Sequence, residues 1–263
     1  MQTSTQLGPD QIAMFDLPGT SPVRRPSKKA AARHDRRQVK IDKSDAGTAE
    51  LKPFEPLNAT QATLFAALEH SDQVFAIGPA GTGKTYIAAR KAIRKLILGQ
   101  VERLIIARPT AAKAKHRLGF LPGKADDKIA PWLVPVLDGF KAEVSGATIE
   151  KMRKAGSIEF LPFEHMRGRS LSGAVVILDE AQNCDLGDLK LFLTRVGSGT
   201  QVIVCGDVDQ VDIPDSGLAS VLAMIEPCGI SAVVVEFSDD DVVRSGIAKQ
   251  WVKAFRTTAP TIH

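Results

Sequence analysis

The 263-residue sequence contains few cysteines, few aromatic residues and no long hydrophobic run. Its three cysteines, Cys184, Cys205 and Cys228, are far apart and form no CxxC pair, which argues against a zinc site. No run of about 18 apolar residues occurs, so no membrane-spanning helix is expected. The chain opens on polar residues instead of a basic and then apolar segment, which predicts no secretory signal. An odd number of cysteines without an export signal indicates reduced thiols and a cytoplasmic location.

The composition is that of a globular protein with an unevenly placed charge. Apolar residues make up 44% and charged residues 24% of the chain, and the net charge is +4. Residues 1–43 hold nine Lys/Arg and four acids, a net charge of +5 that leaves −1 on the remainder. This basic segment either holds nucleic-acid phosphates or is only a solvated leader. We predict a disordered, Pro-containing N-terminal extension over residues 1–52 and one folded domain over residues 53–263.

A complete phosphate-binding motif occupies residues 78–85, which fit Gly-x-x-x-x-Gly-Lys-Ser/Thr at every specified position. An apolar run precedes the motif and an unbroken helix-like segment follows it, which is the order of strand, loop and helix that the motif requires. Glycines let backbone N–H groups turn inward around phosphate oxygens at the start of a helix. We therefore expect a nucleoside triphosphate to be bound by Gly78, Pro79, Ala80, Gly81, Thr82, Gly83, Lys84, Thr85 and Tyr86.

Four of the expected site residues have individual roles. Lys84 would reach the β- and γ-phosphates as a point charge, and the Thr85 hydroxyl would ligate Mg²⁺. A second apolar run ends in Asp179 and Glu180, so both carboxylates emerge at the tip of a buried strand. We expect Asp179 to hold Mg²⁺ opposite Thr85, and Glu180 to orient or deprotonate the attacking water.

Apolar runs near residues 74, 104, 158, 175, 202 and 233, mostly separated by helical stretches, predict an α/β domain. Its sheet is expected to be mainly parallel and flanked by helices, with ligands at the carboxyl ends of the strands. At that edge, Arg108 and the basic residues after it could meet a polyanion. Gln210 could sense the γ-phosphate. Residues 118–157 are expected to form an insertion between strands, with a helix over 147–155.

Two further residues have alternative interpretations. Gln61 lies near the start of a helix that precedes the phosphate-binding motif, and its amide offers the donor and the acceptor that an adenine edge requires. A surface glutamine is the alternative, and these residues alone favour it. Arg244 follows three aspartates at the start of the last expected helix. It could reach a γ-phosphate as an arginine finger, or it could pair with those acids.

Eight motifs in order along the chain resemble the PhoH family. They are Gly78–Thr85, Arg108-Pro109, Leu118–Gly123, Met166–Arg169, Ile177–Asn183, Phe192–Arg195, Gly206–Gln210 and Asp241–Arg244. The resemblance covers roughly residues 53–256 and leaves residues 1–52 outside. The chain departs from the family pattern in the Lys-rich segment 111–117, at Lys124 and at Ser245-Gly246, and none of these belongs to the nucleotide motifs.

This resemblance implies a single RecA-like P-loop domain, similar to the first motor domain of superfamily 1 helicases. It implies that the domain binds and hydrolyses ATP with Mg²⁺. It further implies that Gln61 contacts adenine and that Gln210 senses the γ-phosphate. Relatives that carry an added nuclease-type domain look like RNA-unwinding rings, so RNA or single-stranded DNA is the expected partner.

The assembly and the reaction class remain open to competing hypotheses. Two-domain motors place ATP between two lobes, whereas this chain has residues for only one, so a second copy is expected to complete the site. A homo-oligomer follows, with a hexameric ring as the favoured form and Arg244, Arg167, Arg169 or Arg195 acting in trans. The alternatives are a small-molecule kinase that uses the same loop, and a regulatory protein in which ATP only controls partner contacts.

Overall fold

The computed structural model describes residue 51, residues 53–109 and 133–243, and residues 246, 247, 250, 251 and 254. Several predictions lie outside these residues. They are the disorder of the N-terminal extension to residue 50, the role of the basic segment 110–117, the family motif at 118–123 and the position of Arg244.

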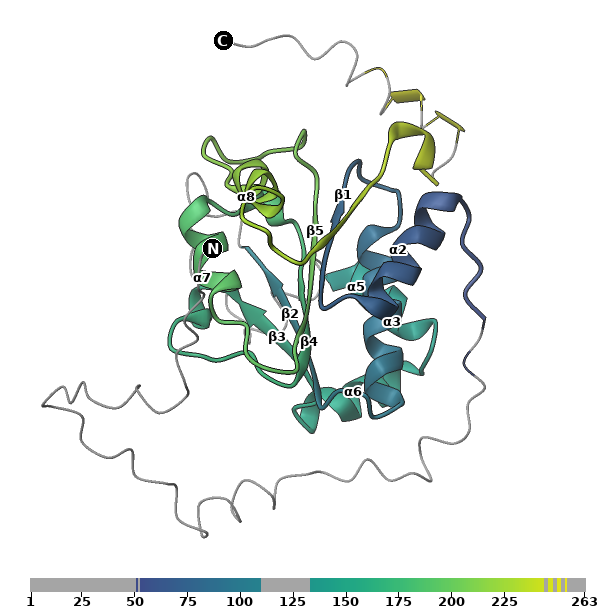
Figure 1. Ribbon diagram of the computed structural model, residues 1–263. Coiled ribbons are helices and arrows are strands. Elements are labelled where there is room, and N and C mark those ends of the chain that lie inside the picture. The colour runs from purple at the N-terminus through teal and green to yellow at the C-terminus, as the bar shows by residue number, and fades with distance from the viewer. Residues whose placement is uncertain are drawn as a thin grey trace, which may run out of the picture. The chain divides into compact units, whose positions relative to one another are not determined.

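Six strands form a single sheet in the order β3-β2-β4-β5-β1-β6, and every pairing between neighbours is parallel (Figure 1). The strands are β1 Gln73–Ile77, β2 Arg103–Arg108, β3 Ile158–Pro162, β4 Ala174–Leu178, β5 Gln201–Gly206 and β6 Val233–Glu236. The central strands are buried along almost their whole length, as continuous apolar runs between two helical layers require. The predicted α/β class and all six predicted strands are confirmed.

Helices cover both faces of this sheet. Two buried hydrophobic clusters, one on each face, join the helices to the strands. One cluster includes residues of α2 Ala59–His70, α3 Lys84–Ile97, α5 Val134–Lys141 and α6 Gly146–Lys154. The other includes residues of the 3-10 helix Phe163–Met166 and of α7 Leu186–Leu193 and α8 Leu218–Ile225. Figure 1 shows α2, α3, α5 and α6 to the right of the strands and α7 and α8 to the left.

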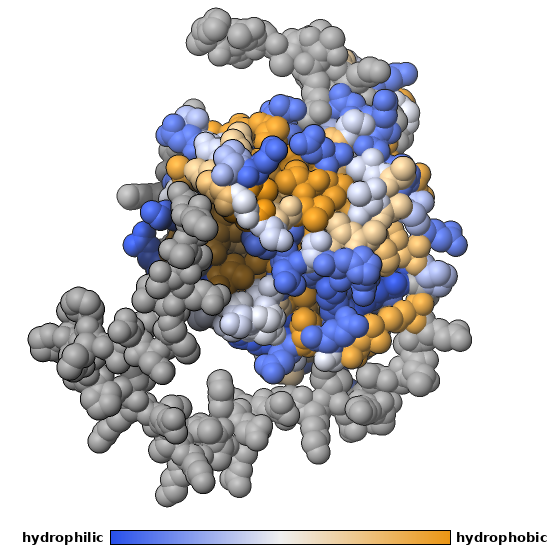
Figure 2. All heavy atoms as spheres, in the orientation of Figure 1, coloured by the Kyte–Doolittle hydropathy of each residue, from blue (hydrophilic) through white to orange (hydrophobic). Residues whose placement is uncertain are grey.

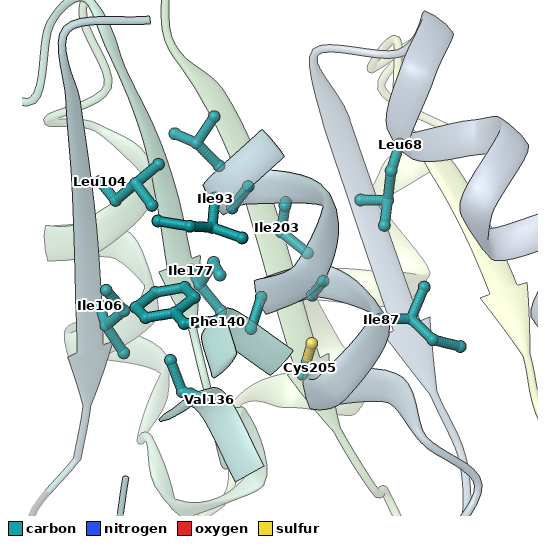
Figure 3. Packing of buried hydrophobic residues seen from close by; sticks show 14 of the residues in the cluster. Leu68, Ile87, Ile93, Leu104, Ile106, Val136, Phe140, Ile177, Ile203 and Cys205 are labelled. Atoms are coloured by element: carbon teal, nitrogen blue, oxygen red, sulfur yellow. The ribbon is translucent and has the colours of Figure 1, made fainter. Parts of the chain in front are cut away.

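Helix α5 was not predicted within the segment 118–157, although the predicted helix near residue 147 is confirmed as α6. It is short and contains Gly139, which weakens the local helical signal. A Cβ added at Gly139 would lie 2.7 Å from the Tyr86 backbone oxygen, so the glycine lets α5 pack closely on the start of α3. Val136 and Phe140 of α5 then fill the core beside Ile106 (Figure 3).

Three helix boundaries also differ from the sequence expectation. The amphipathic helix expected to stop at Gly197 ends at Leu193, and the one expected from about Ser216 begins at Leu218. The last expected helix begins only as the 3-10 turn Asp239–Asp241, whose Ser238 and Asp241 form a reciprocal capping box. By contrast, α2 is capped by Asn58, one of the two residues expected to do so.

Hydrophobic residues also reach the surface. Figure 2 shows them in patches among hydrophilic residues on the face in view. The exposed large apolar side chains include Met224 of α8, Val234 of the edge strand β6, and Ile230 in the connection between them. Among the residues that the structure describes, no helix combines the length and the hydrophobicity needed to cross a membrane.

Candidate functional site

The carboxyl ends of three neighbouring strands meet at one edge of the sheet. Strand β5 lies between β4 and β1 and pairs with both in parallel, so the loops that follow these strands emerge side by side. They enclose a cavity of about 270 Å³. Its lining residues are Ala80, Gly81, Gly83, Lys84, Thr85, Tyr86, Pro135, Asp179, Glu180, Gln182, Cys205, Gly206, Asp207 and Gln210. The cavity therefore contains most of the residues that the sequence selected.

The phosphate-binding loop depends on glycine at Gly78, Gly81 and Gly83, whose φ angles are 134°, 86° and 91°. At Gly78 an added Cβ would lie 2.2 Å from the backbone oxygen of Phe237, so no other residue fits. The Lys84 ammonium is nearly buried and donates to the carbonyl oxygens of Gly78 at 2.6 Å and Pro79 at 2.7 Å. Gly78 and Pro79 thus shape the loop around Lys84 instead of lining the cavity themselves. Burial lowers the pKa of Lys84.

Thr85 and Asp179 meet across the cavity. The Thr85 hydroxyl donates to Asp179 Oδ1 at 2.6 Å, and the Asp179 side chain is 6% exposed. Burial raises the pKa of Asp179, whereas the Thr85 hydrogen bond and the charge of Arg108 oppose that rise. Two adjoining oxygen donors suit Mg²⁺, a hard cation that takes its remaining ligands from phosphates and water. Among the described residues no cluster of three or more acidic, histidine or cysteine side chains offers a self-contained metal cage.

Glu180 has an unusual backbone and a fully engaged carboxylate. Its φ of 55° makes it the only non-glycine residue with positive φ in the described part of the chain. Arg108 Nη2 donates to Glu180 Oε1 at 3.1 Å, and Gln182 Nε2 donates to Oε2 at 2.6 Å. The side-chain oxygen Oε1 of Gln182 in turn accepts from the Asp207 backbone N–H at 3.1 Å. Both carboxylate oxygens of Glu180 thus accept hydrogen bonds, while 39% of its side chain is exposed.

The loop that carries Gln210 is tied to the segment after Glu180. The Asn183 side chain donates to Asp212 Oδ2 at 3.1 Å and accepts from the Asp212 backbone N–H at 3.1 Å. Together with the bond between Gln182 and Asp207, this fixes both ends of the loop. Gln210 is exposed and lines the cavity, and its role as a γ-phosphate sensor stays a prediction.

Gln61 is buried beside the phosphate-binding loop, which excludes the alternative of a surface glutamine. Its amide donates to the Thr82 carbonyl oxygen at 2.9 Å, and its own oxygen accepts from the Leu57 backbone N–H at 2.9 Å. Gln61 therefore stabilises the phosphate-binding loop through Thr82 without lining the cavity. Its contact with adenine stays a prediction.

Sequence reasoning did not find two partners of Glu180. Arg108 was assigned to a polyanion, yet its guanidinium contacts Asp179 Oδ2 at 3.3 Å as well as Glu180. For Gln182 the sequence offers only membership of a family motif. The signal for both was their position, because each lies at or just beyond the carboxyl end of a strand. The cavity lining also includes Cys205, and burial raises the pKa of its thiol.

The arginines considered for a role in trans differ in their surroundings. Arg169 forms a two-pronged ion pair with Glu159, and Arg195 donates to the Arg169 backbone oxygen at 3.3 Å. Arg167 is exposed. Arg244 lies outside the described residues, but the preceding Val243 donates its N–H to the Gly81 carbonyl oxygen at 3.0 Å.

A family model described as PhoH-like protein matches residues 53–256. A PhoH-like protein of Bacillus subtilis is 42% identical over 199 residues, which cover 74% of this chain and 61% of that protein. A PhoH-like protein of Mycobacterium tuberculosis H37Rv is 42% identical over 207 residues, covering 78% and 58%. The large terminase of a thermophilic bacteriophage is similar in structure with a TM-score of 0.49 and 11% identity, covering 76% of this chain and 50% of the terminase. The chain thus spans about three fifths of the length of these two curated relatives.

Proposed function

This chain belongs to the PhoH family of nucleotide-binding P-loop proteins, and we propose that it hydrolyses ATP to act on RNA or single-stranded DNA. One observation supports the hydrolytic part most directly. A phosphate-binding loop with its lysine, two adjoining carboxylates and an exposed glutamine line the same cavity. A protein that only stored nucleotide would not need a second carboxylate held by two side chains next to the first.

In the proposed reaction each of these residues acts at a definite place. Lys84 binds the β- and γ-phosphates, and Thr85 and Asp179 would hold Mg²⁺, which when bound neutralises phosphate charge. Glu180 orients a water molecule and accepts its proton. The water oxygen forms a bond to the γ-phosphorus as the bond to the β-phosphate oxygen breaks, which yields ADP and inorganic phosphate. Gln210 donates a hydrogen bond to the γ-phosphate.

The nucleic-acid part of the proposal draws on family membership and on the charge of the chain. The basic residues of segments 1–43 and 111–117 would attract a phosphate backbone without regard to its sequence. The decisive experiment measures phosphate release with and without poly-U RNA or single-stranded DNA. We expect turnover without nucleic acid and faster turnover with it.

Other outcomes of that experiment would favour the competing functions. Transfer of phosphate to a nucleoside or sugar would identify a small-molecule kinase, and tight binding without turnover would identify a regulatory protein. The Glu180→Gln variant separates binding from chemistry, because it keeps the size of the side chain but removes the proton acceptor. It should bind a fluorescent ATP analogue normally and release phosphate at least about 100-fold more slowly. Normal turnover by this variant would disprove the assignment of Glu180 as the base.

A further inference from the structure

Arg108 is the last residue of β2, and its guanidinium contacts both acidic residues that follow β4. One nitrogen lies 3.3 Å from Asp179 Oδ2 and another 3.1 Å from Glu180 Oε1. Such a fork-shaped contact between an arginine and two carboxylates is a charge-assisted hydrogen-bonding arrangement that orients the groups it joins. The orientation of Glu180 therefore depends on a residue that belongs to neither nucleotide motif.

The sheet places Arg108 on the far side of these acids from the phosphate-binding loop. In the order β2-β4-β5-β1, strands β4 and β5 separate Arg108 from the loop that follows β1. Asp179 and Glu180 line the cavity, whereas Arg108 is not among its lining residues. This geometry favours an arginine that acts on Glu180 over one that acts directly on a γ-phosphate.

The two donors that hold Glu180 differ in how easily they can be removed. Gln182 is buried and is itself anchored by the Asp207 backbone N–H. Arg108 is the more accessible donor, because 27% of its side chain is exposed. A phosphate group that approached from solvent would offer the guanidinium the same fork of oxygens that the carboxylates offer. Arg108 is thus the donor that an outside anion can take from Glu180.

We propose that Arg108 restrains Glu180 and slows basal hydrolysis, and that a phosphate of a single-stranded nucleic acid relieves the restraint by competing for its guanidinium. The proposal rests on the proposed function in that it takes Glu180 as the base. It makes Arg108 a positioning residue, which acts on the reaction through Glu180. Hydrolysis and strand binding would then be coupled within a single lobe.

The test compares Arg108→Gln with Arg103→Gln. Arg103 is the same residue type at the opposite end of β2, where it donates to the Ser172 carbonyl oxygen at 3.1 Å. Steady-state phosphate release gives kcat and the KM for ATP, each with and without poly-U. We expect Arg108→Gln to raise basal kcat about fivefold, the factor that one net hydrogen bond represents, with KM unchanged. The ratio of its kcat with poly-U to its kcat without poly-U should fall towards one. Arg103→Gln should have the same kcat, KM and stimulation as wild type.

Several outcomes would overturn the proposal. A basal kcat of Arg108→Gln at or below that of wild type would show that Arg108 does not restrain Glu180. Undiminished stimulation of this variant by poly-U would show that nucleic acid does not act through Arg108. Arg108→Lys keeps the charge without the fork and should lie between wild type and Arg108→Gln, which a variant damaged in folding would not do. If neither RNA nor single-stranded DNA changes the ATP hydrolysis of wild type, the proposed nucleic-acid function is wrong. A higher basal kcat of Arg108→Gln would still support the restraint of Glu180 by Arg108.

Discussion

At the scale of single residues, Glu143 has a fully buried side chain that pairs with two arginines of α3. It accepts hydrogen bonds from Arg90 and, at 2.8 Å, from Arg94 Nη2. Arg90 and Arg94 also lie over the rings of Phe54 and Phe65. Among the described residues, the second carboxylate oxygen of Glu143 has no hydrogen-bond partner. This cluster therefore joins the segment after α5 to α3 through charge as well as through packing.

The first prediction is that Glu143→Gln destabilises the fold. The substitution removes the negative charge that faces the nearly buried guanidinium groups of Arg90 and Arg94. Breaking a buried ion pair in this way costs about 3–5 kcal/mol. Urea unfolding measures the change as a shift in midpoint at constant slope. The control is Glu150→Gln, because Glu150 pairs with Arg153 at 3.1 Å and its side chain is 51% exposed. That variant should change the free energy of unfolding by less than about 1 kcal/mol. An equal change in the free energy of unfolding for the two variants would indicate that the contacts with Phe54 and Phe65, and not the ion pairs, stabilise the cluster.

At the scale of elements, the packing of α5 against α3 links the fold to the site. Gly139 allows the close approach, and Pro135 in the first turn of α5 lines the cavity. The nearest atoms to an added Cβ at Gly139 are the Tyr86 backbone oxygen at 2.7 Å and the Ala89 Cβ at 2.8 Å. Neither belongs to a flexible side-chain end, so α5 itself would have to move.

A second prediction contrasts two glycine replacements in helices. Gly139→Ala gains up to about 1 kcal/mol of helix propensity. Overpacking against α3 costs about 1–3 kcal/mol, so we expect net destabilisation and weaker binding of a fluorescent ATP analogue. Gly146→Ala in α6 should be neutral or stabilising, because no atom lies within 4 Å of its added Cβ. Thermal unfolding of both variants checks the contrast, and a Gly139→Ala protein as stable as wild type would contradict it.

The sequence predicts the strands and the phosphate-binding loop because their signals are local. Each central strand is one apolar run, and the loop is one contiguous motif. The order of strands is not local, and only the pairing of β2 with β4 brings Arg108 to Glu180. Helix α5 escapes prediction for a similar reason. Its glycine opposes a helix by propensity, and only the contact with α3 explains why glycine is there.

At the scale of the whole molecule, the candidate cavity lies at the edge of a single sheet, and at its border Glu180 is partly exposed and Gln210 is exposed. A motor that encloses ATP between two lobes needs a second surface there. A neighbouring copy of the chain would supply it, and the exposed Arg167 belongs to the set of arginines that could act in trans. An arginine supplied in this way raises the rate on the order of 10³-fold or more.

A third prediction follows for the intact protein. The rate of phosphate release per chain should rise with protein concentration and level off where light scattering shows a complete oligomer. Dilution should reverse the rise, because a dissociated chain loses the groups that its neighbour contributes. A monomer with undiminished turnover at low concentration would contradict a shared site.

The left-handed backbone of Glu180 has a consequence for laboratory evolution. Glycine would adopt the φ of 55° without the strain that glutamate carries, which amounts to roughly 1 kcal/mol or more. Glycine would also remove the carboxylate that Arg108 and Gln182 contact, so relief of strain and loss of these hydrogen bonds would oppose each other in a selection for heat resistance. Engineers who seek a more durable protein from this chain should hold that position constant, since its side chain is the one that we assign as the base.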